Sequence, residues 1–257
     1  MTFEQAIEWA MKDKSCPLNL SQAKVEPLNH GMINKSARLI IDGHCYLLKV
    51  FANQDIIPLN RQAQFILQGR IARHQMAARP VYLSQCQTVW IEQWLELELF
   101  RSGVPDAIEQ LAIASANIHQ LPIQTRDLPL LAHWRKYQSH CLQPEQYEAD
   151  IRAAAGIWEG LEKNVLCHHD LALGHIAKAP KGMVIDWEYA ANSSRFFDLC
   201  CTIRANQLSS DAQVRFISDY ARLSGQNETE LGDQVDKIMP LALLTERLWL
   251  DANRVCT

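Results

Sequence analysis

The sequence lacks the features that mark a membrane protein or a secreted protein held together by disulfides. It contains no run of 18 apolar residues, so we expect no membrane-spanning helix and no membrane partner. Residues 1–11 include Glu4 and Glu8 and lack a basic stretch followed by an apolar core, which argues against a signal peptide. The eight cysteines are scattered without a Cys-x-x-Cys pair, a pattern typical of reduced thiols. Together these absences predict a cytoplasmic protein.

An excess of basic residues is also missing. The 25 lysines and arginines against 29 aspartates and glutamates leave a net charge of −4, so the sequence does not indicate a nucleic-acid partner. With 48% apolar and 21% charged residues, the composition is ordinary for a globular protein. A chain of 257 residues can bury a sizeable core and form one large domain or two lobes.

The hydrophobic pattern predicts strands in the first part of the chain and helices in the second. Residues 35–41 and 44–50 form a predicted hairpin, because Asp42-Gly43 between two apolar runs favours a tight turn. The other predicted elements are helices at 3–12 and 59–73, strands at 81–84 and 88–92, and helices from about 105, at 144–163, at 210–223 and at 228–254. This order indicates an α+β fold with an N-terminal lobe at 1–95 and a C-terminal lobe at 96–257.

The chemistry is concentrated between residues 167 and 188. His168-His169-Asp170 stands in a predicted loop, and Asp186 follows the apolar triplet 183–185, which is typical of a buried strand. An acid at the end of a buried strand is costly unless it has a partner or a metal. Two loop carboxylates this close in sequence therefore suit one base and one metal ligand.

These motifs resemble those of the kinase-like small-molecule phosphotransferases, which include aminoglycoside phosphotransferases, choline and ethanolamine kinases and bacterial thiamine kinases. The family pattern is His-x-Asp-x-x-x-x-Asn followed by a strand that ends in Asp. Here it reads from His168 to His175 and then at Asp186, and the segments 185–190 and 195–199 look most like the choline and thiamine kinase branch. The resemblance covers roughly residues 25–205. It implies a two-lobed protein-kinase-like fold and ATP-dependent phosphotransfer to a small-molecule alcohol.

The resemblance also implies roles for the loop residues. Asp170 would accept the proton of the attacking hydroxyl, and Asp186 would bind Mg²⁺. His175 stands where the family has Asn, so a nitrogen ligand would replace an oxygen ligand and make Mn²⁺ an alternative to Mg²⁺. His168 is expected to brace the loop by hydrogen bonds, and His169 to face solvent. Asp198, near the start of a helix, looks like a second brace.

The resemblance places the nucleotide in the N-terminal lobe. Gly31 and Asn34 match a phosphate-binding loop ahead of the hairpin, although a plain turn between strands is the alternative. Lys49 ends the second hairpin strand and would contact the phosphates. Gln93 and Trp94 match the connector between the lobes and would lie near the adenine, or form a strand end with a core tryptophan.

The helix expected to follow this lysine departs from the family. Kinase-like folds pair the strand lysine with a glutamate on a helix. The sequence at 60–65 offers Gln62 and Gln64 instead. A glutamine side chain could still accept a hydrogen bond from the lysine, but it carries no negative charge to pair with the ammonium.

The acceptor is expected to be a cationic alcohol of the choline or thiamine type. Carboxylates and aromatic rings bind such cations, and the candidates are Glu188, Tyr189 and Trp249. A position in the core is the alternative for Trp249.

Two other functions fit parts of the same pattern. His175 in place of Asn and the missing helix glutamate suit a catalytically degraded protein that binds a nucleotide or a metabolite. A metal-dependent hydrolase would use the histidine-rich cluster as a zinc site, although neighbours in sequence cannot all point at one ion. That cluster comprises Cys167, His168, His169, Asp170 and His175.

Overall fold

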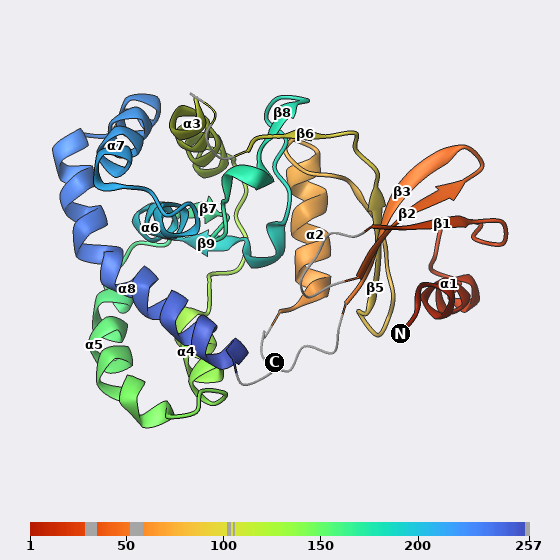
Figure 1. Ribbon diagram of the computed structural model, residues 1–257, viewed down its shortest axis with the longest axis horizontal. Coiled ribbons are helices and arrows are strands. Elements are labelled where there is room, and N and C mark those ends of the chain that lie inside the picture. Colours follow the sequence, from red (N-terminus) through yellow and green to blue (C-terminus); the bar gives the residue numbers. More distant parts are fainter. Residues whose placement is uncertain (29–34, 52–58, 102–103, 105, 255–257) are drawn as a thin grey trace. The chain divides into compact units, whose positions relative to one another are not determined.

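The computed structural model describes residues 1–28, 35–51, 59–101, 104 and 106–254. The chain divides into two compact units (Figure 1). The first unit comprises Met1–Asp55 and Asn60–Leu97, and the second comprises Ile56–Leu59 and Glu98–Thr257. Among the described residues, no helix combines the length and the apolar character needed to cross a bilayer.

The first unit is built on a five-stranded antiparallel sheet. Its strand order is β1-β2-β3-β5-β4. The strands are β1 (Lys24–Leu28), β2 (Lys35–Ile41), β3 (His44–Val50), β4 (Pro80–Leu83) and β5 (Val89–Gln93). The expected hairpin is confirmed, with β2 and β3 in the register Lys35 to Val50 through Ile41 to His44. Asp42 and Gly43 both have positive φ, 48° and 78°, as a two-residue hairpin turn that follows the strand twist requires.

One face of this sheet is covered by α1 (Phe3–Lys12). The helix begins at a capping box, in which the Thr2 hydroxyl accepts from the Gln5 N–H and the Gln5 side chain accepts from the Thr2 N–H. Its small buried residues pack against the inward side chains of β2, β3 and β5 in one apolar core. That core includes Ala6, Ala10, Leu39, Leu48 and Ile91.

The alternation of side chains along β3 and β5 turns a second set of residues away from that core. Leu48 and Val50 point inward, so Lys49 points to the opposite face of the sheet. The helix α2 (Arg61–Ala72) contributes Gln68 to that face, where it bonds Glu92 of β5. The sheet therefore separates an apolar core from a polar face.

The second unit is mostly helical. Its helices are α3 (Ala107–His119), α4 (Leu130–Gln138), α5 (Glu148–Glu159), α6 (Arg195–Ala205), α7 (Ser210–Ser224) and α8 (Glu228–Arg254). Two short antiparallel pairs join β6 (Glu98–Leu99) to β8 (Ala177–Ala179) and β7 (Val165–Cys167) to β9 (Ala191–Ser193). Single 3₁₀ turns lie at η1 (Pro144–Tyr147), η2 (Leu173–His175) and η3 (Trp187–Tyr189).

The helices of the second unit enclose its core. The helix α3 packs against α7, and α6 packs against α8, which also contacts α4, α5 and α7 (Figure 1). The largest fully buried side chains of this core include Trp134, Phe197, Phe216 and Tyr220. The predicted order of strands first and helices second is thus confirmed.

Some predicted elements differ in the structure. The triplet Met183–Ile185 is buried at its first two residues but is not a strand, because only Val184 forms a bridge, with Ile176. A turn at 180–182 and a left-handed Asp186, with φ of 68°, confine the pairing to that bridge. The helix predicted from Pro144 begins as η1 and ends at Glu159, before Lys163.

The core of the second unit yields a stability prediction. Phe216 is fully buried on α7, whereas Val214 on the same helix is 67% exposed. We expect Phe216→Ala to lower the free energy of unfolding by about 3–5 kcal/mol, because it leaves a cavity. The control Val214→Ala should change it by less than about 0.5 kcal/mol. Urea unfolding of both variants measures the difference, and equal losses would contradict the assigned core.

Candidate active site

The loop that follows β7 is braced from inside by His168. The side chain of His168 is fully buried, and its ring lies 4.8 Å from the Trp187 ring. Its Nδ1 accepts from the Asp170 N–H at 3.3 Å, so Nε2 carries the hydrogen and donates to the Ile185 carbonyl at 3.1 Å. Burial lowers the pKa of His168 to about 4, which keeps the ring neutral. The expected brace is therefore present.

His169 does not face solvent, so that expectation is wrong. Its backbone is left-handed, with φ of 66°. Nδ1 lies 2.9 Å from the Tyr189 carbonyl and donates to it, and the ring lies 5.9 Å from Phe197. Burial lowers the pKa of His169, and no described residue bonds its buried Nε2. His169 thus links the loop to η3.

Asp170 has the properties of a general base. Burial raises its pKa, the nearby His175 opposes that rise, and the negative charges of Asp186 and Glu188 add to it. The resulting pKa is about 6. A carboxylate with this pKa accepts a proton more readily than an ordinary aspartate and remains ionised at neutral pH.

Asp170, His175 and Asp186 form a cluster of three potential metal ligands. One ligand atom of each lies within 4.8 Å of the others. His175 Nδ1 lies 2.8 Å from the Asp170 carbonyl oxygen and donates to it, so Nε2 of the neutral ring presents a lone pair. That Nε2 lies 3.8 Å from Asp186 Oδ2.

This arrangement fits a divalent cation. An imidazole that donates one N–H to a carbonyl and presents its other nitrogen is the usual geometry of a histidine ligand. A lone pair that faces a carboxylate is repelled by it unless a cation or a proton lies between them. The side chain of Asp186 is 46% exposed, which leaves it accessible from solvent.

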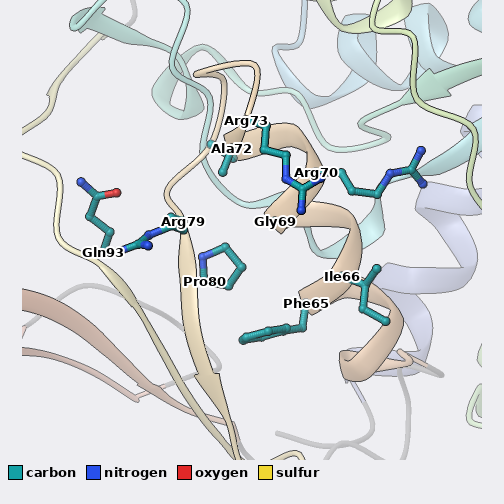
Figure 2. Close-up of a pocket in the computed structure, with 10 residues that line it drawn as sticks. Phe65, Ile66, Gly69, Arg70, Ala72, Arg73, Arg79, Pro80 and Gln93 are labelled. Atoms are coloured by element: carbon teal, nitrogen blue, oxygen red, sulfur yellow. The ribbon is translucent and has the colours of Figure 1, made fainter. Parts of the chain in front are cut away.

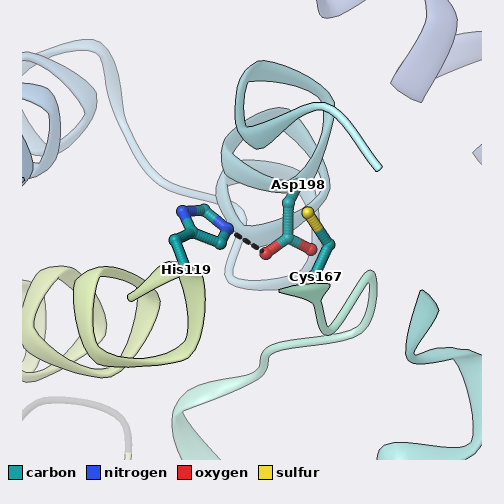
Figure 3. Close-up of side chains that lie close together, drawn as sticks. All are labelled: His119, Cys167 and Asp198. Atoms are coloured by element: carbon teal, nitrogen blue, oxygen red, sulfur yellow. Dashed lines mark hydrogen bonds and ion pairs between the residues drawn. The ribbon is translucent and has the colours of Figure 1, made fainter. Parts of the chain in front are cut away.

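A second, buried cluster contains Cys167, His119 and Asp198 (Figure 3). Burial raises the pKa of the Cys167 thiol well above its usual value, so the thiolate that zinc requires is disfavoured. The members of the zinc cluster suggested by the sequence point elsewhere, because His168, His169 and His175 each bond a different carbonyl. The structure does not gather that cluster around one ion.

Asp198 on α6 and Asn206 just after it hold the loop by hydrogen bonds. Asp198 is fully buried, and its Oδ1 accepts from the His169 N–H at 2.6 Å, as expected for a brace. Asn206, which follows the helix, accepts from the Leu173 N–H and donates to the Leu171 carbonyl, both at 2.8 Å. Sequence reasoning missed Asn206, and its only signal was an amide residue at the end of a helix.

In the first unit, Lys49 has an acid partner on a strand. Its Nζ lies 3.2 Å from Oε1 of Glu92, whose side chain is 6% exposed. The other oxygen of this carboxylate accepts from Gln68 Nε2 at 2.7 Å and from Trp90 Nε1 at 2.8 Å. The glutamate sought on the helix is therefore replaced by one on β5, while Gln64 accepts from Arg61.

The connector residues lie at the end of β5. The Gln93 N–H donates to the Arg79 carbonyl at 2.8 Å, and its exposed side chain lines a hollow of about 540 Å³ beside Pro80 and Phe65 (Figure 2). Trp94 is only partly buried, and its indole N–H donates to Glu96 at 2.8 Å. Gly31 and Asn34 lie outside the described residues.

The acceptor candidates Glu188 and Tyr189 stand on η3. Burial raises the pKa of the Tyr189 phenol, and Tyr137 and Glu188 add to the rise. Burial also raises the pKa of Tyr137 to about 12, again with a contribution from Glu188. The Glu188 carboxylate thus acts on both phenols. Sequence reasoning missed Tyr137 of α4, which is buried in the core. Trp249 is partly buried on α8.

Comparison with known proteins supports the resemblance found in the sequence. A model of a family described as "Phosphotransferase enzyme family" matches residues 24–233. No curated protein matches the chain.

Several solved structures share the fold. Choline kinase LicA from Streptococcus pneumoniae is 17% identical, with a TM-score of 0.64 over 92% of this chain and 94% of that chain. A Plasmodium vivax ethanolamine kinase is 18% identical, with a TM-score of 0.69 over 89% and 75%. A macrolide 2′-phosphotransferase from Brachybacterium faecium is 16% identical, with a TM-score of 0.56 over 98% and 96%. The protein-kinase-like fold expected from the sequence is therefore confirmed.

The raised pKa of Asp170 predicts a stability change that opposes its chemical role. The ionised Asp170 carboxylate destabilises the folded protein, because its pKa is higher in the folded state than in the unfolded chain. This destabilisation is fully present above pH 6, decreases as the pH falls below 6 and vanishes below pH 3.8. In metal-free protein at pH 8, Asp170→Asn should raise the free energy of unfolding by roughly 1–3 kcal/mol. Urea unfolding between pH 8 and pH 4 measures the effect.

The matched control is Glu162→Gln, which removes an exposed acid from the same unit. Its stability should follow that of the wild-type protein at every pH, within about 0.5 kcal/mol. A loss of stability in Asp170→Asn at pH 8 would contradict the raised pKa.

Proposed function

The chain belongs to the phosphotransferase enzyme family, and from this premise we propose that it transfers a phosphoryl group from ATP to the hydroxyl of a small molecule. The observation that carries the proposal is the cluster of Asp170, His175 and Asp186, whose ligand atoms lie within 4.8 Å of one another. Phosphoryl transfer needs one base and two metal ligands from the part of the protein that binds the acceptor and the metal.

Each member of the cluster has a part in the proposed reaction. Asp170 accepts the proton of the attacking hydroxyl and orients its oxygen toward the γ-phosphate. His175 and Asp186 hold Mg²⁺ or Mn²⁺, with His175 fixed by its bond to the Asp170 carbonyl. When bound, the metal neutralises charge on the phosphates.

The first unit supplies the nucleotide side in this proposal. In this proposal, residues 1–95 form the N-terminal lobe, to which most of the first unit belongs. Residues 96–257 form the catalytic lobe. Lys49 contacts the phosphates, and Glu92 limits where its ammonium can lie. Gly31 and Asn34 serve the phosphates as well, and Gln93 and Trp94 lie near the adenine.

We propose a cationic alcohol as the acceptor. Glu188 supplies negative charge, and the partly exposed Tyr189 supplies an aromatic ring, which suit an ammonium or a quaternary amine. Choline and ethanolamine kinases among the structural neighbours support this substrate class. Trp249 is a further candidate for the same role.

The first test is turnover itself. The protein is incubated with ATP, Mg²⁺ and, separately, choline, ethanolamine, thiamine and an aminoglycoside, and ADP and the phosphorylated product are measured. We expect turnover with at least one cationic alcohol. Asp170→Asn should lower it by roughly 10²–10⁴-fold, because the base is lost while the shape of the side chain is kept.

Two outcomes would argue against this assignment. Near-normal turnover in Asp170→Asn would remove Asp170 as the base. ATP binding by calorimetry without turnover on any of the four acceptors would favour a degraded kinase-like protein that binds a nucleotide or a metabolite.

The second test addresses the metal. Nitrogen is a softer ligand than the amide oxygen of Asn, so the wild-type protein should work relatively better with Mn²⁺ than with Mg²⁺. His175→Asn should raise the rate with Mg²⁺ and lower the ratio of the Mn²⁺ rate to the Mg²⁺ rate. Rates of both proteins with both metals decide the question.

His140→Asn is the control, because it makes the same change at a histidine of the turn that follows α4, where the ring bonds the nearby Ser139 hydroxyl and Lys136 carbonyl. It should leave the metal ratio unchanged. If His175→Asn also leaves the ratio unchanged, His175 is not a ligand.

A further inference from the structure

The catalytic loop is tied to α3 and α7 through a chain of buried polar side chains. His119, the last residue of α3, places Nε2 2.8 Å from Asp198 Oδ2 and Nδ1 2.8 Å from the Tyr220 hydroxyl of α7. Figure 3 shows the imidazole directed at the Asp198 carboxylate. The side chains of His119 and Asp198 are 2% and 0% exposed, and Tyr220 is fully buried.

The direction of each hydrogen bond follows from the charge on Asp198. Burial by itself would raise the pKa of this carboxyl, but its hydrogen bonds from His119 and from the His169 N–H outweigh burial and lower it. An ionised carboxylate only accepts, so His119 Nε2 donates to it. When the ring is neutral, Nδ1 accepts from the Tyr220 hydroxyl.

The far end of this chain is the catalytic loop. The second oxygen of Asp198 accepts from the His169 N–H at 2.6 Å, and His169 precedes Asp170. His169 has a left-handed backbone, with φ of 66°, which a residue with a side chain adopts only when its surroundings hold it there. The bond from Asp198 is one of the contacts that hold it.

We propose that His119 and Tyr220 are positioning residues for phosphoryl transfer, because they fix the Asp198 carboxylate and, through it, the backbone that carries Asp170. The inference rests on the proposed function. Neither residue touches the reacting atoms, and their effect is on the placement of the base. A base displaced by about 1 Å can lower the rate of transfer by about 100-fold without weakening substrate binding.

The effect of this chain should therefore fall on kcat. His119→Leu removes the donor to Asp198, and we expect kcat to fall by roughly 10–100-fold while KM for ATP and for the acceptor stays within about twofold. Tyr220→Phe removes only the hydroxyl and should lower kcat by about 3–10-fold. His119→Gln keeps an N–H donor with similar reach and should recover most of the loss.

A matched control separates positioning from general stability. Thr245→Val removes a partly buried hydrogen bond of the same unit, in which the Trp134 indole N–H donates to the Thr245 hydroxyl at 2.8 Å. It should lower the thermal midpoint as Tyr220→Phe does and leave kcat unchanged. If Tyr220→Phe changes kcat no more than Thr245→Val does, the proposal is overturned, even if His119→Leu fails to fold.

A second measurement does not depend on activity. In hydrogen–deuterium exchange, the peptide that spans the catalytic loop, residues 166–175, should exchange faster in Tyr220→Phe than in the wild-type protein or in Thr245→Val. Unchanged exchange there would show that the chain does not fix the loop. Absence of turnover in the wild-type protein would overturn the proposed function and with it the catalytic role, while the exchange result would still decide the structural link.

Discussion

The hydrogen bonds to the buried Asp198 carboxylate are the interaction on which the loop at residues 168–175 of the second unit depends. A fully buried ionised acid is costly unless donors surround it, and here it has the His169 N–H on one oxygen and His119 on the other. These donors come from the catalytic loop and from α3. Asp198 itself is placed by α6, so one charge holds three segments together. Removing it would leave the loop N–H and the buried imidazole without their acceptor.

Three aspartates of this unit differ in role because their surroundings differ. Asp198 is held ionised by buried donors, which lower its pKa. Asp170 is deprived of water and faces other negative charges, so its pKa rises to about 6. Asp186 lies more open to solvent and faces the lone pair of His175. In the proposed function the same side chain would therefore serve as an anchor, a base and a ligand, with the environment deciding which.

The sequence predicted the fold well wherever its signals were local. The hairpin follows from Asp42-Gly43 between apolar runs, and the long helices α7 and α8 follow from their periodicity. Strands of three residues, such as β7 and β9, carry too little periodicity to be recognised. The triplet at 183–185 shows the opposite error, because an apolar run indicates burial but does not ensure a pairing partner.

The sequence by itself determined the spacing of His168, Asp170 and Asp186, which is a property of the chain order, and it identifies the family through a match over residues 24–233. Only the tertiary structure decided which partners those residues have. His119 meets Asp198 across 79 positions of the sequence and meets Tyr220 across 101, and Lys49 finds its acid on a neighbouring strand. Such contacts depend on how helices and strands pack, and packing reflects the burial of the whole core. No local pattern of residues encodes it.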